Sequence, residues 1–144
     1  MSGSSRPRAA GIPATRNTAQ RQAIRDAFAE ADGPLSIAAV LERARRDVPD
    51  LDLSTIYRNL NRLVAEGWLL RLEIPPLGVF YEESGKEHHH HFHCRVCRRM
   101  LELPGCCIDT KRAPRGFVTE SHEVFLYGVC AACSGGPRRR RTKA

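Results

Sequence analysis

Possible metal ligands are densest between residues 82 and 97. Five of the six histidines and the pair Cys94 and Cys97 fall in this stretch, and a second pair, Cys130 and Cys133, follows later. Two cysteines spaced by two residues can point their thiolates at one ion, and two such pairs make a closed tetrahedral site for structural Zn²⁺. A disulfide or a thioredoxin-like redox pair is the alternative, but neither pair sits at a strand-to-helix turn of a βαβ unit. The spacing therefore predicts a Cys₄ zinc site.

Four consecutive histidines at residues 88–91 lie just before the first cysteine pair. If this run is a β-strand, alternation sends His89 and His91 to one face and His88 and His90 to the other. One short tract could then serve two separate metal sites. A solvated loop of adjacent imidazoles is the alternative, and we expect the nearby His93 to pack or to point to solvent.

Three segments upstream carry apolar residues at helical spacing. The first segment has a predicted cap at Asn17 or Thr18 and ends at residues 32–34. The second segment begins after Ser36 and stops at Pro49. We therefore expect two short helices ahead of the third segment.

The third segment opens at Ser54 or Thr55, ends at Gly67 and presents a face rich in hydrogen-bond donors. The members of this face are Thr55, Arg58, Asn59 and Arg62, with Tyr57 at its margin. Strand-like runs at residues 69–74 and 79–82 flank a proline-rich turn, which predicts a hairpin. Three helices followed by a hairpin describe a winged helix-turn-helix, whose third helix enters the major groove of DNA. A small helical domain with a merely solvated polar face is the alternative.

The composition describes a small basic protein. Its 144 residues carry a formal net charge of +7, but five positive charges belong to residues 138–141 and Lys143. The body is therefore only mildly basic, which by itself is weak evidence for a nucleic-acid partner. The chain is too short for a large enzyme. It shows neither a secretory signal nor a membrane-spanning run, which indicates the cytoplasm, where cysteine pairs more often hold metal.

Several motifs, in this order along the chain, resemble the ferric uptake regulator family. They are the helix SxxYRNLNRLxxEGW, the hairpin end Phe80-Tyr81-Glu82, the tract HHHHFHCxxC, and His122 followed by LYGxCxxC. The resemblance covers about residues 14–133, and the ordered combination is highly specific. It implies a homodimeric winged-helix repressor with a β-rich dimerisation domain, which binds palindromic operator DNA when a regulatory metal is loaded.

The resemblance also implies a role for each candidate side chain. The structural zinc site falls on Cys94, Cys97, Cys130 and Cys133. The regulatory site at the hinge falls on Glu82, His89 and His91. A second metal site falls on His88, His90 and His122 with an acidic partner. The family's DNA contacts fall on Arg16, Tyr57 and Arg58, to which the helical face adds Thr55 and Arg62.

The chain departs from the family pattern at both regulatory sites. Iron-sensing members place a hinge histidine where this chain has Pro34, and zinc-sensing members often place a cysteine where it has Ser84. The fourth hinge ligand therefore stays open between Glu73, Glu83 and water. In addition, the segment between Cys97 and His122 is a few residues shorter than in the family pattern. The last ligand of the second site therefore stays open. The candidates are Cys106, Cys107 and Asp109.

A thiolate at the second site would favour zinc over iron, whereas the alternative is that Cys106 and Cys107 are a small buried hydrophobe and an exposed thiol. Residues 99–103 and 124–129 look like strands, and residues 108–115 look like a short helix or a loop. These strands complete the predicted C-terminal domain.

We expect an α+β protein made of a winged helix-turn-helix domain and a small α/β dimerisation domain with a Cys₄ zinc site. The expected parts are a disordered arm at residues 1–14, a DNA-binding domain at 15–83, a metal-binding dimerisation domain at 84–133 and a disordered basic tail at 134–144. The expected cofactors are structural Zn²⁺ and a regulatory Zn²⁺ or Fe²⁺, with zinc favoured. The expected partners are double-stranded operator DNA and a second copy of the chain, with no membrane and no small-molecule substrate.

Two other functions remain as alternatives. A peroxide-sensing or redox-sensing regulator would use an iron site or the thiols of Cys106 and Cys107. A zinc hydrolase would need an open coordination position and a general base such as Glu82 or Glu87, but no HExxH-type spacing is present. We therefore expect a regulator and not an enzyme.

Overall fold

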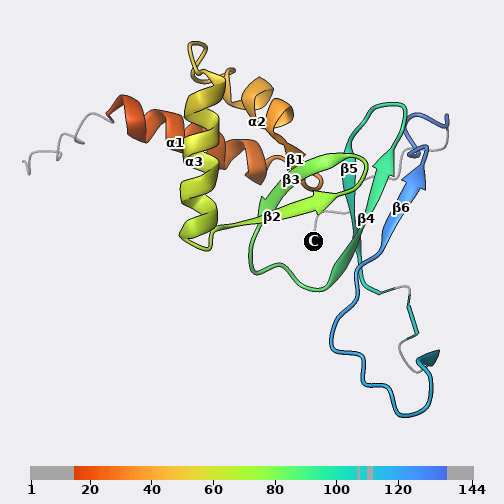
Figure 1. The fold of residues 1–144 in the computed structure, drawn as a ribbon. Coiled ribbons are helices and arrows are strands. Elements are labelled where there is room, and N and C mark those ends of the chain that lie inside the picture. The colour runs from red at the N-terminus through yellow and green to blue at the C-terminus, as the bar shows by residue number, and fades with distance from the viewer. Residues whose placement is uncertain (1–14, 107, 110–111, 136–144) are drawn as a thin grey trace, which may run out of the picture.

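The computed structural model describes residues 15–106, 108–109 and 112–135. In chain order it contains α1 (Arg16–Ala29), β1 (Leu35–Ser36), α2 (Ile37–Ala44), α3 (Leu53–Ala65), β2 (Leu69–Ile74), β3 (Gly78–Glu83), β4 (His89–Cys94), β5 (Met100–Pro104) and β6 (Phe125–Gly128). The helices gather at one end and the second sheet at the other, with the β2–β3 hairpin between them (Figure 1). The predicted α+β class is confirmed. The predicted N-terminal arm, the tail beyond Gly135 and Cys107 lie outside the described residues.

Helix starts depend on one side-chain acceptor each. Ser36 caps α2 as predicted, because its hydroxyl accepts a hydrogen bond from the amide of Ala39. The predicted cap of the first helix at Asn17 or Thr18 is wrong, since Thr15 accepts from the Thr18 amide and α1 begins at Arg16.

The other predicted helix limits also shift. Asp52 caps α3, not Ser54 or Thr55, because its carboxylate accepts from the Thr55 amide at 2.7 Å, and this bond lowers the Asp52 pKa. The second helix ends at Ala44, before the predicted stop at Pro49, and the intervening residues form turns.

The three helices enclose the main hydrophobic core. Its fully buried members include Ile24 from α1, Val40 from α2, and Ile56, Leu60 and Leu63 from α3. The predicted apolar stripe of α3 therefore faces inward. An ion pair between Arg21 and Glu66 further ties α1 to the end of α3.

The predicted hairpin is confirmed as β2 and β3, which pair antiparallel with Leu70 opposite Glu82. β1 adds on the other side of β3, with Leu35 opposite Tyr81, giving the sheet order β1-β3-β2. Glu82 lies near the end of β3, which leads into the connection to β4.

A second sheet has the order β5-β4-β6. β4 and β5 pair antiparallel with His91 opposite Glu102, whereas β4 and β6 run parallel. The strands predicted at residues 99–103 and 124–129 are present with slightly shifted limits, and residues 108–109 and 112–115 contain no α-helix. The histidine tract therefore occupies the central strand, and the β5–β6 connection extends away from both sheets (Figure 1).

The winged region and the second sheet meet at a close backbone contact. The amide of Glu102 donates to the carbonyl of Asp32 at 2.9 Å, and Arg99 approaches the Asp32 carboxylate at 3.6 Å. A Cβ on Gly33 would lie 2.4 Å from the Met100 carbonyl oxygen, which shows how tightly the chain segments pack. A small hydrophobic cluster spans the same junction and comprises Ile74, Phe80 and Met100. One relative orientation of the two regions is therefore favoured.

We expect Gly33→Ala to destabilise the junction by about 1–3 kcal/mol, because the obstructing atoms are backbone and cannot rotate away. Denaturant unfolding and small-angle scattering measure the loss of stability and the altered domain arrangement. Gly128→Ala is the matched control, since its added Cβ would meet only the Phe92 ring. Equal midpoints and equal radii for the two variants would contradict this expectation.

Candidate metal centres and nucleic-acid interface

The four cysteines of the two CxxC pairs come together at one end of the second sheet. Their sulfur atoms all lie within 4.8 Å of one another, and the Sγ atoms of Cys97 and Cys130 are 3.9 Å apart. Cys94 is supplied by the end of β4, and the Cys130 amide donates to its sulfur at 3.3 Å. The parallel pairing of β4 with β6 brings the two distant pairs into this contact.

The electrostatics of this cluster fit a divalent cation. Hydrogen bonds from the backbone amides of Cys130 and Cys97 lower the pKa of Cys94 to about 5. The neighbouring thiols, Cys130 first, raise the pKa of Cys133 to about 12, because a second thiolate beside them is unfavourable. A bound Zn²⁺ would remove that repulsion and hold all four thiolates.

A second cluster lies at the hinge between β3 and β4. The Glu82 carboxylate, only 4% exposed, lies 3.1 Å from His89 Nε2 and 3.2 Å from His91 Nε2. These three predicted ligands therefore converge, and they come from both the wing and the second sheet. Neither Glu73 nor Glu83 belongs to the cluster within the described residues, and Glu73 pairs with Arg71 instead.

Opposing effects set the charges at the hinge. Burial would raise the Glu82 pKa, but hydrogen bonds with His91 and His89 outweigh it and lower that pKa. Burial would lower the His89 pKa, but the Glu87 carbonyl, the Glu82 carboxylate and the charge of Glu102 outweigh it and raise that pKa. A buried carboxylate shared by two imidazoles is a donor set that suits a divalent metal.

The sequence reasoning missed Glu102. This residue lies opposite His91 in the β4–β5 register, and its charge acts on His89. Its carboxylate now accepts a hydrogen bond from Lys86 at 2.6 Å. Alternation along residues 99–103 could have placed it on the hinge face, had the register with β4 been known.

A third cluster combines His88, His90, Cys106 and His122. His122 Nε2 lies 3.1 Å from both His88 Nε2 and Cys106 Sγ. His90 is 2% exposed, and neither of its ring nitrogens has a hydrogen-bond partner among the described residues. Burial, followed by the charges of His88 and His122, lowers the His90 pKa. Unpaired buried nitrogens beside a thiol fit a metal such as Zn²⁺.

Two of the three predicted candidates for the last ligand of this third cluster, Cys106 and Asp109, lie within the described residues. Cys106 joins the three histidines, whereas Asp109 is not among the converging ligand atoms of the described residues. His93 lies outside all three clusters and its ring packs near Tyr127 at 6.3 Å between centroids, as expected. The histidine alternation predicted for β4 is therefore confirmed.

Only some of the residues predicted on the donor-rich face of α3 are exposed. Thr55 and Asn59 are only 8% and 7% exposed, because α1 lies against this side of α3 and Asn59 donates to the Thr55 carbonyl. Tyr57, Arg58 and Arg62 remain exposed. Thr55, predicted on the donor-rich face, is therefore almost buried, and its hydroxyl accepts a bond from Arg58 at 3.3 Å.

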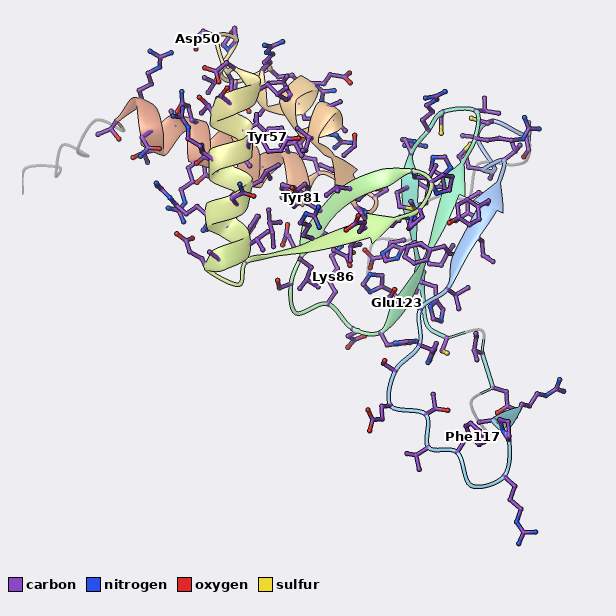
Figure 2. The ribbon with its side chains drawn as sticks, viewed as in Figure 1. Asp50, Tyr57, Tyr81, Lys86, Phe117 and Glu123 are labelled. Carbon is purple, nitrogen blue, oxygen red and sulfur yellow. The ribbon has the colours of Figure 1, made fainter. Side chains whose placement is uncertain are left out.

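A polar pocket of about 230 Å³ lies between the exposed edges of α1 and α3. Its lining combines Asn17 and Gln20 of α1 with Thr55, Arg58, Asn59 and Arg62 of α3. Arg16 is the first residue of α1, not a residue ahead of it, and pairs with Asp50 at 2.6 Å while staying exposed. Figure 2 shows Tyr57 on α3 and Asp50 in the loop that precedes it. The described residues contain no helix with the length and hydropathy of a membrane span.

The winged helical region, the β-rich metal-ligand domain and the Cys₄ cluster together define a DNA-binding regulator that responds to metal. The model of the ferric uptake regulator family matches residues 13–127. The chain belongs to this family, whose members are transcription regulators and not enzymes.

Individual relatives agree with this assignment. The chain is 30% identical over 124 residues to the ferric uptake regulation protein of Bordetella parapertussis, covering 83% of this chain and 89% of that protein. It resembles the Helicobacter pylori ferric uptake regulator, which has three functional metal-binding sites, with 25% identity, a TM-score of 0.58 and coverage of 80% and 79%. The Francisella tularensis ferric uptake regulator with iron has the same fold, with a TM-score of 0.63, 24% identity and coverage of 90% and 99%.

We expect Cys94→Ser to unfold or monomerise the protein. A Cys₄ site contributes metal-binding free energy to folding, about 10–16 kcal/mol in zinc-finger peptides. Zinc content, circular dichroism and sedimentation measure the effect. Cys106→Ser is the control and should keep the fold, because Cys106 is exposed and outside the Cys₄ cluster. A folded dimer after Cys94→Ser would contradict the structural role.

Proposed function

We propose that this chain is a homodimeric repressor that binds operator DNA when a regulatory metal occupies the hinge cluster. The observation that carries the proposal is the junction of Glu82 from the wing with His89 and His91 from the second sheet. A metal bound to all three holds the wing against the second sheet. We take residues 15–83 as the DNA-binding domain and residues 84–133 as the dimerisation domain, acting on DNA in the cytoplasm.

Metal binding acts through linkage. A site assembled from two domains closes in only one relative orientation, so the metal favours that orientation by its differential affinity. In a two-fold dimer the orientation sets the separation of the two α3 helices. That separation must match one helical turn of DNA, or a multiple, for both helices to contact operator half-sites. Loaded protein then binds the operator and empty protein does not.

Glu102 is our candidate for the fourth hinge ligand. It lies opposite His91, and its amide already contacts Asp32 of the winged region. A cation at the hinge would compete with Lys86 for the Glu102 carboxylate. The fourth ligand would then come from the strand that also contacts the winged region, which strengthens the link between metal and domain orientation.

Zinc is the metal that the donor sets favour. The Cys₄ cluster suits structural Zn²⁺, and the third cluster includes the Cys106 thiol, which is a softer ligand than a carboxylate. Three clusters match in number the three functional sites of the Helicobacter pylori protein. On these donor sets we propose zinc as the sensed metal, with Fe²⁺ as the other candidate for the hinge.

A homodimer is supported by exposed apolar side chains beside and beyond β6. β6 is an edge strand of the second sheet, and Tyr127 on it is 55% exposed. Phe117 lies in the β5–β6 loop (Figure 2), and its neighbour Val118 is 86% exposed. Apolar surface next to a free strand edge is typical of an association face.

The DNA-binding surface combines exposed donors of α1 and α3. We propose that Tyr57 and Arg58 reach base edges, while Arg16 and Arg62 contact phosphates. Thr55 acts by orienting Arg58 through their hydrogen bond, since it is itself almost buried. The polar pocket between the helices leaves room for backbone atoms of the DNA.

One observation favours a redox-sensing regulator as the second candidate. Cys106 is exposed and its sulfur lies 3.1 Å from His122 Nε2, so oxidation would remove a ligand from the third cluster. Such a protein would lose operator binding on treatment with peroxide without any chelator.

We expect the double substitution His89→Ala with His91→Ala to abolish metal-dependent operator binding while leaving a folded, zinc-containing dimer. The reason is that two of the three hinge ligands are lost, whereas the Cys₄ cluster is untouched. Gel-shift titration with buffered metal measures the effect. His93→Ala is the matched control on the same strand and should behave as wild type. Unchanged metal dependence in the double variant would contradict the hinge assignment.

We expect Arg58→Ala to weaken operator binding by about 1–3 kcal/mol, the discrimination supplied by a side chain that contacts a base edge. Binding to operator and to random DNA, measured at several salt concentrations, checks it. Arg71→Ala is the control, because Arg71 lies on β2 and pairs with Glu73. An equal loss on random DNA would reassign Arg58 to a phosphate contact.

We expect Cys106→Asp to lower the zinc affinity of the third cluster by about tenfold or more. Losing a residue that only hydrogen-bonds to a metal ligand already costs that much affinity, and Cys106 would be a ligand itself. Affinity for Fe²⁺ or Mn²⁺ should fall less, because a carboxylate suits harder cations. Competition titrations with metal indicators measure the change, and the Cys₄ zinc serves as internal control. Peroxide that releases wild type but not Cys106→Asp from DNA would favour the redox candidate.

A further inference from the structure

A cleft of about 380 Å³ lies between α2 and the turn that joins Cys94 to Met100. The cleft runs along the junction of the two domains, because α2 belongs to the winged region and the turn to the second sheet. Its lining carries four guanidinium groups, supplied by Arg43, Arg46, Arg98 and Arg99, against the two carboxylates of Asp32 and Glu42. The cleft is therefore an electropositive space shared by both domains.

Only one of these arginines has a partner among the described residues. Arg99 pairs with Asp32 and with the Cys97 thiol, and the thiol contact raises the Arg99 pKa. Within the described residues, Arg43, Arg46 and Arg98 make neither a side-chain hydrogen bond nor an ion pair. Four arginines against two carboxylates, with three of the arginines unpaired among the described residues, leave this space with an excess of positive charge that favours an anion.

Arg98 stands out by its backbone. Its φ is 60°, in the left-handed region that glycine adopts most easily, and it is the only non-glycine residue with positive φ in the described chain. The turn is fixed there by the bond from the Arg98 amide to the Cys94 carbonyl at 2.9 Å. An arginine therefore occupies a position where glycine would relieve strain, and its guanidinium lines the cleft.

We propose that this cleft binds a small multivalent oxyanion, such as phosphate or a di- or tricarboxylate, clamped between Arg43 of α2, Arg46 of the turn that follows α2, and Arg98 of the second domain. Guanidinium groups match such oxygens with paired hydrogen bonds in fixed geometry. The volume of about 380 Å³ lies within the range of small-molecule sites and exceeds the size of a single phosphate. The site lies apart from all three metal-ligand clusters, except that Cys97 also lines the cleft.

Such an anion would act as a second effector. Its clamp needs α2 and the second domain in the orientation that also brings Glu82 to His89 and His91. Anion and hinge metal therefore favour the same arrangement, and each raises the affinity of the protein for the other by the same factor. This inference goes beyond the proposed function and concerns a separate ligand.

The test is calorimetric titration of the full-length, zinc-containing protein with inorganic phosphate and with citrate in a chloride buffer. We expect saturable binding at one site per chain. Arg43→Ala and Arg98→Gly should each weaken it about tenfold or more, because each removes charged hydrogen bonds. Glycine suits the backbone at position 98, so this variant keeps the fold. Arg95→Ala is the matched control, since Arg95 belongs to the same turn but does not line the cleft.

Three results would overturn the proposal. The first is the absence of saturable heat with both probes. The second is an equal loss in Arg95→Ala, which would indicate general charge attraction. The third is no binding of either probe combined with weaker operator binding and a smaller salt slope in Arg43→Ala and Arg98→Gly, which would assign these arginines to DNA phosphates. Because calorimetry reads anion binding directly, the outcome is distinguishable from failure of metal-dependent repression.

Discussion

The alternation of side chains along β4 is the constraint on which the rest of the structure depends. β4 is the central strand of its sheet, so its two faces look toward different parts of the molecule. One face sends His89 and His91 to Glu82 of the wing, and the other sends His88 and His90 to Cys106 and His122. The strand then ends at Cys94, which begins the Cys₄ cluster. Five residues between His88 and Cys94 therefore contribute to three metal-ligand clusters without competing for them.

The hinge cluster carries an energetic cost that a metal would remove. Burying a carboxylate is unfavourable unless opposite charge and hydrogen bonds compensate it. Without metal, His91 and His89 supply the hydrogen bonds and the opposite charge that compensate for the burial of Glu82. These interactions lower the Glu82 pKa despite the burial. A divalent cation bound to these three side chains would neutralise the carboxylate directly. The free energy gained would act across the junction between the wing and the second sheet and would favour one domain arrangement.

A small set of described contacts orients the two domains. They include the backbone bond between Glu102 and Asp32, the close packing at Gly33 and a three-residue hydrophobic cluster. Small interfaces of this kind allow relative motion unless a ligand adds to them. The hinge metal and the proposed anion would each add contacts between the two domains, through different helices and strands. Two ligands that stabilise one arrangement are coupled without touching each other.

Local patterns in the sequence determined the elements and most of the ligands, because helical spacing, turns and strand alternation are properties of neighbouring residues. They predicted the winged hairpin, the Cys₄ cluster and the separation of the histidine tract into two faces. Tertiary structure decided what depends on distant partners: that Thr55 is buried against α1, that Cys106 joins His88 and His122, and that Glu102 faces the hinge. These facts follow from helix packing and strand register, which no single segment encodes. The arginine-lined cleft belongs to the same group, since its walls come from two domains that only the folded chain brings together.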